Sequence, residues 1–469
     1  MPSFRKAVAV CATVALCGVS VRAGQASPPL PDFGRLRDEA VQLLQALIRI
    51  DTSNPPGNET RAVEYIRTLL DHEGIPSQTF SRDPARASIV ARLKGSGRRR
   101  PILLMGHTDV VGVEREKWHV DPFAGTLSAD NFVSGRGAID DKDTVAAALL
   151  TLLSLHRLKV PLDRDVIFLA EAGEEGTPEV GITFMVDNHW DAIDAEIALA
   201  EGGDIPVRAG RIRYVGVATT EKVQHTVTLV ARGTSGHGSM PRLDNPIVHL
   251  SAAIVKIGAY QPPMRLNETT KAFFDRTAAI SPPDEAALLR RLEDPATQET
   301  LRRTNITYNS MLRTSISPNI FNGGFRVNVI PGDARATLDV RALPGEDMDK
   351  LLADLRMLVN DPSVDIVRTP PNRPSGPPSP LDSDLFRALE RSARTVFPDV
   401  PTIPMMLTGA TDMAQLRAKG VKAYGISEPV DEKDPTAHGN DERVSVEALG
   451  KYVEYLYRAV VEVAAAAAR

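Results

Sequence analysis

The sequence predicts an α/β protein with a mixed, mostly parallel sheet that is flanked by helices and interrupted by a small inserted α+β domain. Apolar strand patterns alternate with helical patterns between residues 101 and 200, which is typical of a largely parallel sheet. The pattern changes near Glu221 to half-exposed strands, and the first pattern resumes after a proline-rich stretch at residues 370–380. These two transitions indicate an insertion within the larger domain.

The chain length and the two transitions define the expected domains. The chain has 469 residues, which is more than one hydrophobic core usually contains. We expect the larger domain to comprise residues 32–221 and 371–469, and the inserted domain to comprise residues 222–370. The net charge of −5 gives no basic excess, so we expect no nucleic-acid partner.

Residues 1–26 have the layout of a secretory signal peptide. Two basic residues precede an apolar run at residues 7–21, and a segment of small residues follows it. The run is shorter than the ~20 residues that a membrane-spanning helix needs, and we expect no membrane span in the mature chain. Cys11 and Cys17 both lie in this run. We therefore expect a secreted or periplasmic protein whose mature form has no disulfide.

The helices and strands of the larger domain follow from the spacing of its apolar residues. A repeat of three to four residues predicts an amphipathic helix, and a short continuous apolar run predicts a buried strand. In chain order we expect helices at 36–50 and 61–72, strands at 88–94 and 101–106, a helix at 143–158, strands at 166–170 and 195–200, a helix at 382–396, strands at 403–407 and 423–427, and a helix at 445–465.

The inserted domain gives a different pattern, with alternating strands and two helices. Residues 331–333 are a turn-forming Pro-Gly-Asp triplet between two strand patterns. Residues 262–324 read as irregular, with a charged helical stretch broken by Pro295, and we assign them no role. The elements expected are a strand at 224–232, a helix at 246–260, strands at 325–330 and 334–342, a helix at 346–359 and a strand at 364–367.

Polar side chains follow three predicted strands of the larger domain at the point where each strand ends. His107 and Asp109 follow the first of these strands, Glu174 and Glu175 the second, and Glu201 the third. Ligands of parallel sheets bind beyond the carboxyl ends of the strands. The sequence therefore predicts one polar site at this edge.

Two further segments supply candidate ligands for the same site. A glycine-rich turn ends in Asp140 and Asp141 at a predicted helix start, where negative charge is favourable, and His438 lies in a loop before the last helix. An acid at a helix start is by itself most often a cap, and a lone histidine is more often structural than a ligand. The prediction of a site therefore depends on all of these pieces occurring together.

The combined residues offer the ligands of a site for two divalent metal ions. Neutral histidine and carboxylate are typical ligands of metals that activate water for hydrolysis. If Asp140 bridges, each ion would also receive one histidine and one terminal carboxylate, with positions left open for substrate. Four carboxylates crowded at one edge would repel one another unless cations balanced them.

Glu174 and Asp109 are candidates for roles beside the metal ions. Adjacent Glu174 and Glu175 cannot point the same way from an extended backbone, so one can bind metal while the other accepts a proton. Asp109 lies two residues beyond His107 and could orient the histidine ring.

At this point the sequence resembles the M20 metallopeptidases, a family that includes carboxypeptidases, aminoacylases and desuccinylases. The resemblance covers residues 35–465 and is strongest at Met105–Val111, Gly135–Lys142 and Ala437–Glu442. It implies a zinc-exopeptidase-like fold and two Zn²⁺ ions per chain, although Co²⁺ and Mn²⁺ suit the same ligands. The zinc ligands that it implies are His107, Asp140, Glu175, Glu201 and His438, with Asp140 bridging.

The resemblance also implies roles for residues around these ligands. Glu174 resembles the general base, Asp109 the partner of His107, and the peptide bond from Asp140 to Asp141 would be cis. Gly173 departs from the family, which often has Asp at this position, as do residues 413–415.

The inserted domain resembles the family's lid, which is often also its dimerisation domain. Residues 233–239 match the motif whose histidine, here His237, stabilises an oxyanion, often in the partner subunit. Asn328 and Arg341 match residues that bind the substrate carboxylate, for which the bidentate geometry of Arg is suited. Thr411 lies in a segment that matches a substrate-side loop.

From the residues and the resemblance together we expect a secreted di-zinc carboxypeptidase or dipeptidase that cleaves the amide bond next to a free carboxylate. The alternative enzyme is an N-acyl-amino-acid deacylase. A third reading is a catalytically silent binding protein, which would have lost a ligand or the base, and neither is lost here. The expected partners are a small peptide or N-acyl amino acid and, through the lid, a second copy of the chain.

Overall fold

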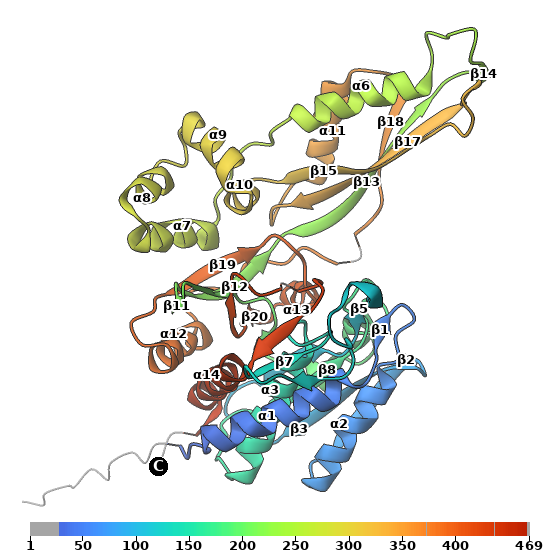
Figure 1. Cartoon of the computed structure of the whole chain (residues 1–469). Coiled ribbons are helices and arrows are strands. Elements are labelled where there is room, and N and C mark those ends of the chain that lie inside the picture. Colours follow the sequence, from blue (N-terminus) through green and yellow to red (C-terminus); the bar gives the residue numbers. More distant parts are fainter. Residues whose placement is uncertain (1–27, 372, 436, 467–469) are drawn as a thin grey trace, which may run out of the picture.

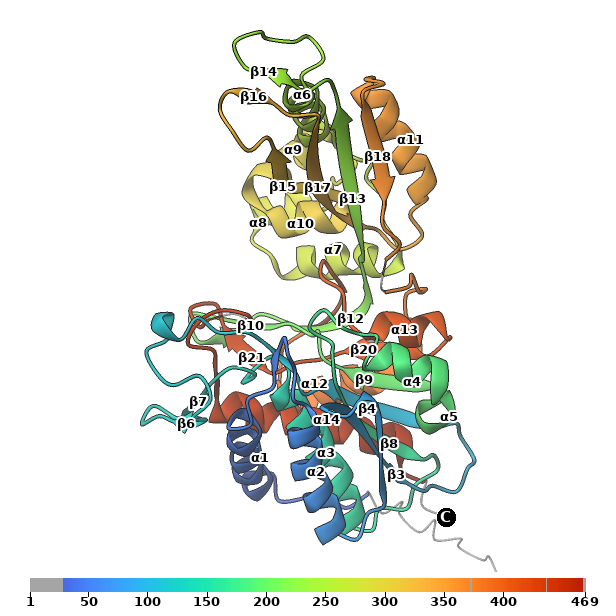
Figure 2. The same ribbon diagram turned by 90° about the vertical axis from the view of Figure 1, so that its right-hand side faces the viewer.

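The computed structural model describes residues 28–371, 373–435 and 437–466. Two sheets dominate it, a larger one with eight strands and a four-stranded one in the inserted domain (Figures 1 and 2). The predicted signal peptide at residues 1–26 lies outside the described residues. Within the described ranges, no helix combines the length and the apolar character that crossing a membrane requires.

The larger sheet has the strand order β19-β12-β20-β9-β4-β8-β3-β2. Four neighbouring pairs are parallel, namely β4 with β8, β4 with β9, β9 with β20, and β12 with β19. The expected mixed, mostly parallel sheet is therefore confirmed. Its strands are β2 (Ser77–Asp83), β3 (Arg86–Leu93), β4 (Ile102–His107), β8 (Val166–Glu171), β9 (Ile197–Ala200), β12 (Val215–Glu221), β19 (Thr402–Leu407) and β20 (Lys422–Gly425).

Alternate residues of the central strands pack into two different cores, one on each face of the sheet. On β4, Ile102 and Leu104 belong to one core, whereas Leu103 and Met105 belong to the other. Side chains alternate across a strand, so helices must cover both faces. The first core includes α1 (Phe33–Ile48), α2 (Thr60–His72), α3 (Lys142–Arg157), α12 (Asp384–Val396) and α14 (Val446–Ala464); the second includes α4 (Ile182–Asn188), α5 (Trp190–Ile193) and α13 (Met413–Ala418).

Short strands order the loops around the larger sheet. The strand β1 pairs with β5, β10 pairs with β11 and β21, and β7 pairs with β6 and β22. These elements are β1 (Ser53–Asn54), β5 (Val110–Val111), a 3₁₀ turn (Arg115–Lys117), β6 (Thr126–Leu127), β7 (Phe132–Ser134), β10 (Ile205–Arg208), β11 (Arg211–Ile212), β21 (Pro429–Asp431) and β22 (Arg443–Ser445).

The inserted domain is an antiparallel sheet of order β15-β17-β13-β18 with helices packed on one face. A small pair, β14 with β16, lies at its tip, far from the larger sheet in both views (Figures 1 and 2). The elements are β13 (Val223–Arg232), β14 (Gly236–His237), α6 (Pro246–Ala259), β15 (Ser315–Gly323), β16 (Val329–Ile330), β17 (Asp333–Ala342), α11 (Met348–Val359) and β18 (Val364–Arg368).

Two expectations for the inserted domain were wrong. The expected strand at 325–330 is a loop apart from Val329 and Ile330; Phe325 is 80% exposed, so its apolar alternation does not reflect a buried face. Residues 262–324 are not irregular, because Pro295 begins a helix instead of breaking one, with Asp294 as its cap. This segment contains α7 (Glu268–Ile280), α8 (Pro283–Leu289), α9 (Pro295–Thr304), α10 (Ile306–Leu312) and β15.

The helices at 268–312 fasten the inserted domain to the larger sheet. Phe274 on α7 shares a buried core with Ile403 and Met406 on β19. Nη1 of Arg276 donates to the carbonyl of Thr402 at 2.8 Å. The inserted domain is therefore connected to the larger domain by packing as well as by the chain crossings.

Lys222 is fully buried at the first crossing, between β12 and β13. Its Nζ donates to the carbonyl of Arg313 at 2.8 Å and to the hydroxyls of Ser310 and Ser315 at 3.0 and 2.6 Å. All three acceptors are neutral. Burial, with a smaller contribution from the charge of Arg341, lowers the pKa of Lys222 to about 7.

We expect this amine to make the stability of the fold pH-dependent. Because the pKa in the folded chain lies below the unfolded value of 10.5, the unfolded chain binds the extra proton between these values, and stability rises with pH through this window. From pH 7 to pH 9, the free energy of unfolding of the wild type should rise by about 2 kcal/mol more than that of Lys222→Met. Urea titrations at both pH values measure this difference, and equal slopes for the two proteins would contradict it.

Candidate active site

Asp140 lies between the two predicted histidine ligands, and each of its carboxylate oxygens faces one of them. Its Oδ1 is 3.1 Å from Nε2 of His107, and its Oδ2 is 3.1 Å from Nε2 of His438. Oε1 of Glu201 lies 3.9 Å from the first of these nitrogens, and Oε1 of Glu175 lies 2.9 Å from the second. The structure thus brings together all five predicted ligands, in two groups that share Asp140.

The donor atoms in these groups fit a pair of divalent metal ions. In each group, one imidazole nitrogen and two carboxylate oxygens lie within 4.8 Å of one another. Histidine and carboxylate are the donors that zinc and similar ions take in catalytic sites, and three protein ligands leave room for substrate.

The ligands come from separate parts of the sheet and its loops. His107 ends β4, Glu175 and Glu201 follow β8 and β9, and Asp140 lies in the turn before α3. The peptide bond between Asp140 and Asp141 is cis, as the resemblance implied. The buried carboxylate of Asp141 accepts a hydrogen bond from the backbone N–H of His107 at 3.0 Å, which ties the turn to the end of β4.

A buried ion pair joins the loop of His438 to this turn. Nη1 of Arg136 donates to Glu442 at 2.6 Å, and Nη2 donates to the carbonyl of His438 at 3.3 Å. The other carboxylate oxygen of Glu442 accepts a hydrogen bond from the N–H of Ile139 at 2.8 Å. The last ligand is therefore held against the segment that carries Asp140.

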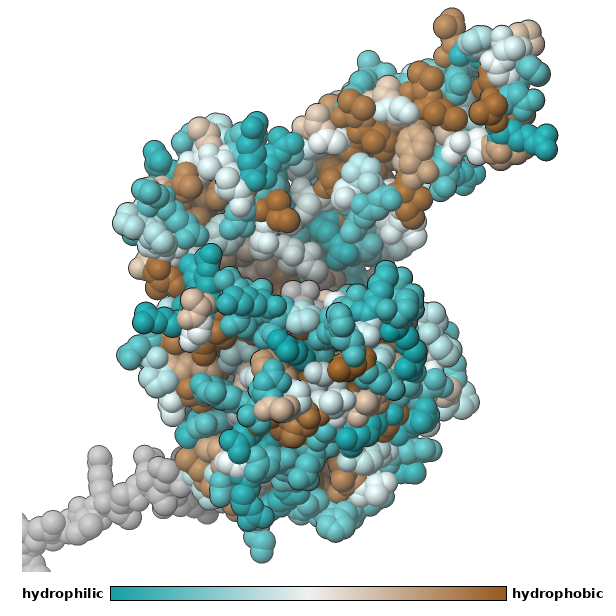
Figure 3. Space-filling model, in the orientation of Figure 1, coloured by the Kyte–Doolittle hydropathy of each residue, from teal (hydrophilic) through white to brown (hydrophobic). Residues whose placement is uncertain are grey.

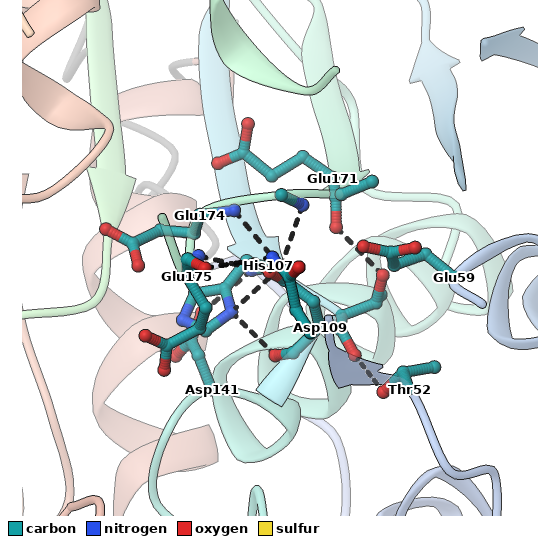
Figure 4. A network of polar contacts seen from close by, with 12 residues as sticks. Thr52, Glu59, His107, Asp109, Asp141, Glu171, Glu174 and Glu175 are labelled. Atoms are coloured by element: carbon teal, nitrogen blue, oxygen red, sulfur yellow. Dashed lines mark hydrogen bonds and ion pairs between the residues drawn. The ribbon is translucent and has the colours of Figure 1, made fainter. Parts of the chain in front are cut away.

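Asp109 is fully buried and holds the turn that carries Glu174 and Glu175 (Figure 4). Its Oδ1 accepts hydrogen bonds from the N–H groups of Gly173 and Glu174 at 2.9 and 3.1 Å, and its Oδ2 accepts one from Glu175 at 3.0 Å. Nδ2 of Asn54 also donates to Oδ2, at 2.9 Å. A single carboxylate thus fixes the backbone of both glutamates.

The ring of His107 contacts Asp109 more closely through the backbone than through the carboxylate. Nδ1 is 2.9 Å from the carbonyl oxygen of Asp109 and 3.5 Å from its Oδ1. A carbonyl can only accept, so Nδ1 carries the proton and Nε2 is left to bind metal. Burial would raise the pKa of Asp109, but its hydrogen bonds, that to His107 foremost, keep the pKa below its ordinary value.

Gly173 departs from the family pattern for a local reason. Its φ is +82°, which favours glycine, and a Cβ at this position would lie 2.5 Å from the carbonyl oxygen of Thr177. The turn can therefore present its two glutamates in this way only with glycine before them.

Glu174 lies beside the ligands and has one arginine partner. Its side chain is buried, and Nη2 of Arg373 contacts its Oε1 at 2.5 Å. Burial, and then the charge of Asp412, raise the pKa of Glu174 to about 8, against the opposing effect of Arg373. A carboxyl group with a pKa near neutrality can both take up and release a proton, as a general base must.

Two of the candidate ligands, His438 and Glu201, have raised pKa values in this arrangement. Hydrogen bonds to Asp140 and Glu175 raise the pKa of His438 to about 10. Burial raises the pKa of Glu201 well above its ordinary value. A cation bound among these groups would replace such protons, so metal binding should release protons from the site.

The predicted lid and substrate residues lie in three places. His237 and Asn328 are both at the tip of the inserted domain, where the N–H of Gly238 donates to the carbonyl of Asn328 at 2.9 Å. Arg341 is at the opposite end of β17, where Nε donates to Asp339 at 3.0 Å. Thr411 is buried beside the ligands and donates to Glu221 at 2.7 Å. The strand β14, which contains His237, and its partner β16, which follows Asn328, lie far from the larger sheet (Figures 1 and 2), so one chain does not bring these residues to the carboxylate cluster.

Several residues that support the site were not predicted from the sequence. Arg136 and Glu442 lie inside the quoted motifs, so the sequence held a signal for them. Asn54 and Arg373 lie in proline-rich segments far along the chain from their partners, and no local pattern marks them.

Comparison with known proteins agrees with this geometry. The family model described as peptidase family M20/M25/M40 matches residues 103–462. The chain is 29% identical to a probable carboxypeptidase S-like 2 of Dictyostelium discoideum over 388 residues. The aligned region covers 80% of this chain and 74% of that protein. It is 29% identical over 377 residues to the human N-fatty-acyl-amino acid synthase/hydrolase PM20D1, covering 77% of this chain and 74% of that protein.

A solved structure has the same fold over most of the chain. The M20 family metallo-carboxypeptidase Sso-CP2 from Sulfolobus solfataricus superimposes with a TM-score of 0.69 at 20% identity, covering 90% of this chain and 98% of that one. With the family model matching residues 103–462, this chain belongs to peptidase family M20/M25/M40 and is a metal-dependent hydrolase.

Proposed function

We propose that this chain is a di-zinc carboxypeptidase or dipeptidase that hydrolyses an amide bond next to a free carboxylate. The observation that carries the proposal is the position of Asp140, with one carboxylate oxygen toward each histidine and the buried Glu174 nearby. The signal-like pattern at residues 1–26 supports secretion or export to a periplasm. His107, Glu201 and Asp140 would hold one ion, and His438, Glu175 and Asp140 the other.

The protein groups would supply proton transfer and charge stabilisation. Divalent ions in this site would lower the pKa of water and polarise the substrate carbonyl. The carboxylate of Glu174 would take the proton from the attacking water and return it to the nitrogen of the leaving amine. The imidazole of His237 would donate a hydrogen bond to the carbonyl oxygen as negative charge develops there.

We propose that Arg341 binds the substrate carboxylate. It lies at the end of β17 nearest the larger domain, and its guanidinium is partly exposed. Nε is occupied by Asp339, which leaves the terminal nitrogens for a substrate carboxylate. Lys222 lies near Arg341, whose charge contributes to lowering the pKa of Lys222.

The alternative is an N-acyl-amino-acid deacylase. The likeness to the human synthase/hydrolase whose name includes N-fatty-acyl-amino acids favours it at the same level of identity as the carboxypeptidase-like relative. Both activities break an amide bond next to a carboxylate, so the same catalytic groups serve either one.

A homodimer formed through the inserted domain would bring the lid residues to an active site. The edge strand β15 has one pairing partner, and Ile320 and Phe321 on it are exposed. On α6, Val248 and Val255 lie two turns apart and are exposed. Figure 3 shows hydrophobic side chains gathered over this domain. Such a surface supports a second copy whose His237 and Asn328 reach this chain's cluster.

We expect zinc-restored release of free amine by the mature protein from dipeptides but not from C-terminally amidated dipeptides. The panel also contains N-acetyl and N-fatty-acyl amino acids, each tested after chelation with and without added zinc. Glu174→Gln is the inactive control, because it keeps the volume and loses the base. Cleavage of the acyl series alone would replace the peptidase proposal with the deacylase, and no zinc-dependent cleavage of any substrate would contradict both.

We expect Asp140→Ala to lose bound metal from both groups, because each group uses one of its oxygens. Glu201→Gln and Glu175→Gln should each lose metal from one group and keep it in the other. Glu179→Gln is the matched control, since this exposed glutamate lies in the same loop and in neither group. Metal per chain after dialysis, measured by mass spectrometry, decides the point; a full metal content in Asp140→Ala would rule out the shared position.

We expect mixed subunits to restore activity if His237 acts in the partner's site. His237→Ala and Glu174→Gln should each be inactive alone. After mixing and exchange of subunits, a heterodimer has one site with both residues, which gives about one quarter of the wild-type activity for random pairing. Light scattering gives the oligomeric state, and an unchanged lack of activity in a proven heterodimer would contradict the arrangement.

A further inference from the structure

Arg373 contacts Glu174 directly, and the proposed mechanism gives Arg373 no role. Its Nη2 donates to the backbone carbonyl of Glu174 at 2.8 Å and to the side-chain Oε1 at 2.5 Å. The guanidinium therefore forms hydrogen bonds with both the backbone and the carboxylate of Glu174. Among the described residues, no other lysine or arginine forms an ion pair with Glu174.

Asp412 holds Arg373 from the other side. Its Oδ1 accepts hydrogen bonds from Nε of Arg373 at 3.2 Å and from Nη2 at 3.0 Å. The side chain of Asp412 is only 2% exposed and that of Arg373 only 13%. A buried guanidinium bound by two carboxylates has little freedom to rotate, so the three residues form a row in which Asp412 orients Arg373 and Arg373 orients Glu174.

The segment that carries Arg373 connects this row of residues to the inserted domain. Arg373 lies on the segment that leads from β18 of the inserted domain back to α12 of the larger domain. Asp412 lies at the start of α13, and Glu174 follows β8. The position of the glutamate side chain therefore depends on how the return segment is seated.

Arg373 is poorly suited to bind the substrate carboxylate. Its Nε and Nη2 already face two protein carboxylates. An incoming carboxylate would meet the charges of Glu174 and Asp412 at the same place. This leaves orientation of the neighbouring glutamate as the task that its geometry fits.

We propose that Arg373 is a positioning residue that holds the carboxylate of Glu174 toward the candidate metal ligands, and that Asp412 keeps Arg373 in place. The inference rests on the proposed role of Glu174 as general base. Misplacement of a catalytic group by about 1 Å can cost on the order of 100-fold in rate, so the effect should appear in kcat.

The test compares Arg373→Met, Arg373→Lys, Arg373→Ala and Asp412→Asn with the wild type. We expect Arg373→Met to lower kcat by about 10- to 100-fold with little change in KM and unchanged metal content. Lysine keeps the charge but not the fork that reaches two acceptors, so Arg373→Lys should fall between Met and wild type. Added guanidinium ions should restore part of the activity of Arg373→Ala but none of that of Glu174→Gln.

Arg368→Met is the matched control, because Arg368 ends β18 just before the same segment and pairs with Asp349. It should keep the wild-type kcat. Wild-type kcat in Arg373→Met, or a loss explained by lower metal content or by higher KM alone, would overturn the inference while leaving the proposed function intact.

Crystal structures of the variants make the test independent of activity. In Arg373→Met, but not in Arg368→Met, the carboxylate of Glu174 should turn away from its wild-type position while His107, Asp140 and Glu175 stay in place. An unmoved Glu174 would overturn the inference. If the wild type cleaves no substrate of the panel, the proposed function fails and the crystal structures still decide whether Arg373 positions Glu174.

Discussion

The carboxylate of Asp140 is the contact on which the rest of the site depends, because it joins ligands from the two ends of the larger domain. One oxygen faces His107 at the end of β4, and the other faces His438, which follows β20 more than three hundred residues later. Burial would raise the pKa of Asp140, but hydrogen bonds to the two histidines hold that pKa below its ordinary value. The Arg136–Glu442 ion pair then fixes the distance between the two segments.

The surroundings of this carboxylate show how a sheet edge tolerates so many acids. The carboxylate of Asp109 accepts hydrogen bonds from backbone N–H groups and from Asn54. Glu442 forms an ion pair with Arg136, and Glu174 and Asp412 both form ion pairs with Arg373. Each neutralising group comes from a different loop. Asp140, Glu175 and Glu201 face the histidines and have no lysine or arginine partner among the described contacts, and divalent ions would balance their charge.

The inserted domain has two ends with different surroundings. Its base is fastened to the larger domain through α7, β19 and the buried Lys222, whereas its tip carries His237 and Asn328 away from the cluster. In the proposed mechanism these tip residues must reach a cluster, which requires closure within one chain or a second copy. The exposed apolar faces of α6 and β15 favour the alternative, in which a second copy supplies the tip residues.

The sequence by itself determined the α/β sheet and the identity of the candidate ligands. Continuous apolar runs mark the buried strands, and His107, Glu175 and Glu201 stand directly after them, so local order in the chain is enough to place them at one edge. The tertiary structure alone decided that Arg373 reaches Glu174, that Asn54 reaches Asp109, and that residues 268–312 are helices packed on β19. These contacts join segments that lie far apart in the sequence. Such contacts form through packing and ion pairing between distant residues, and these interactions leave no periodic pattern in the sequence.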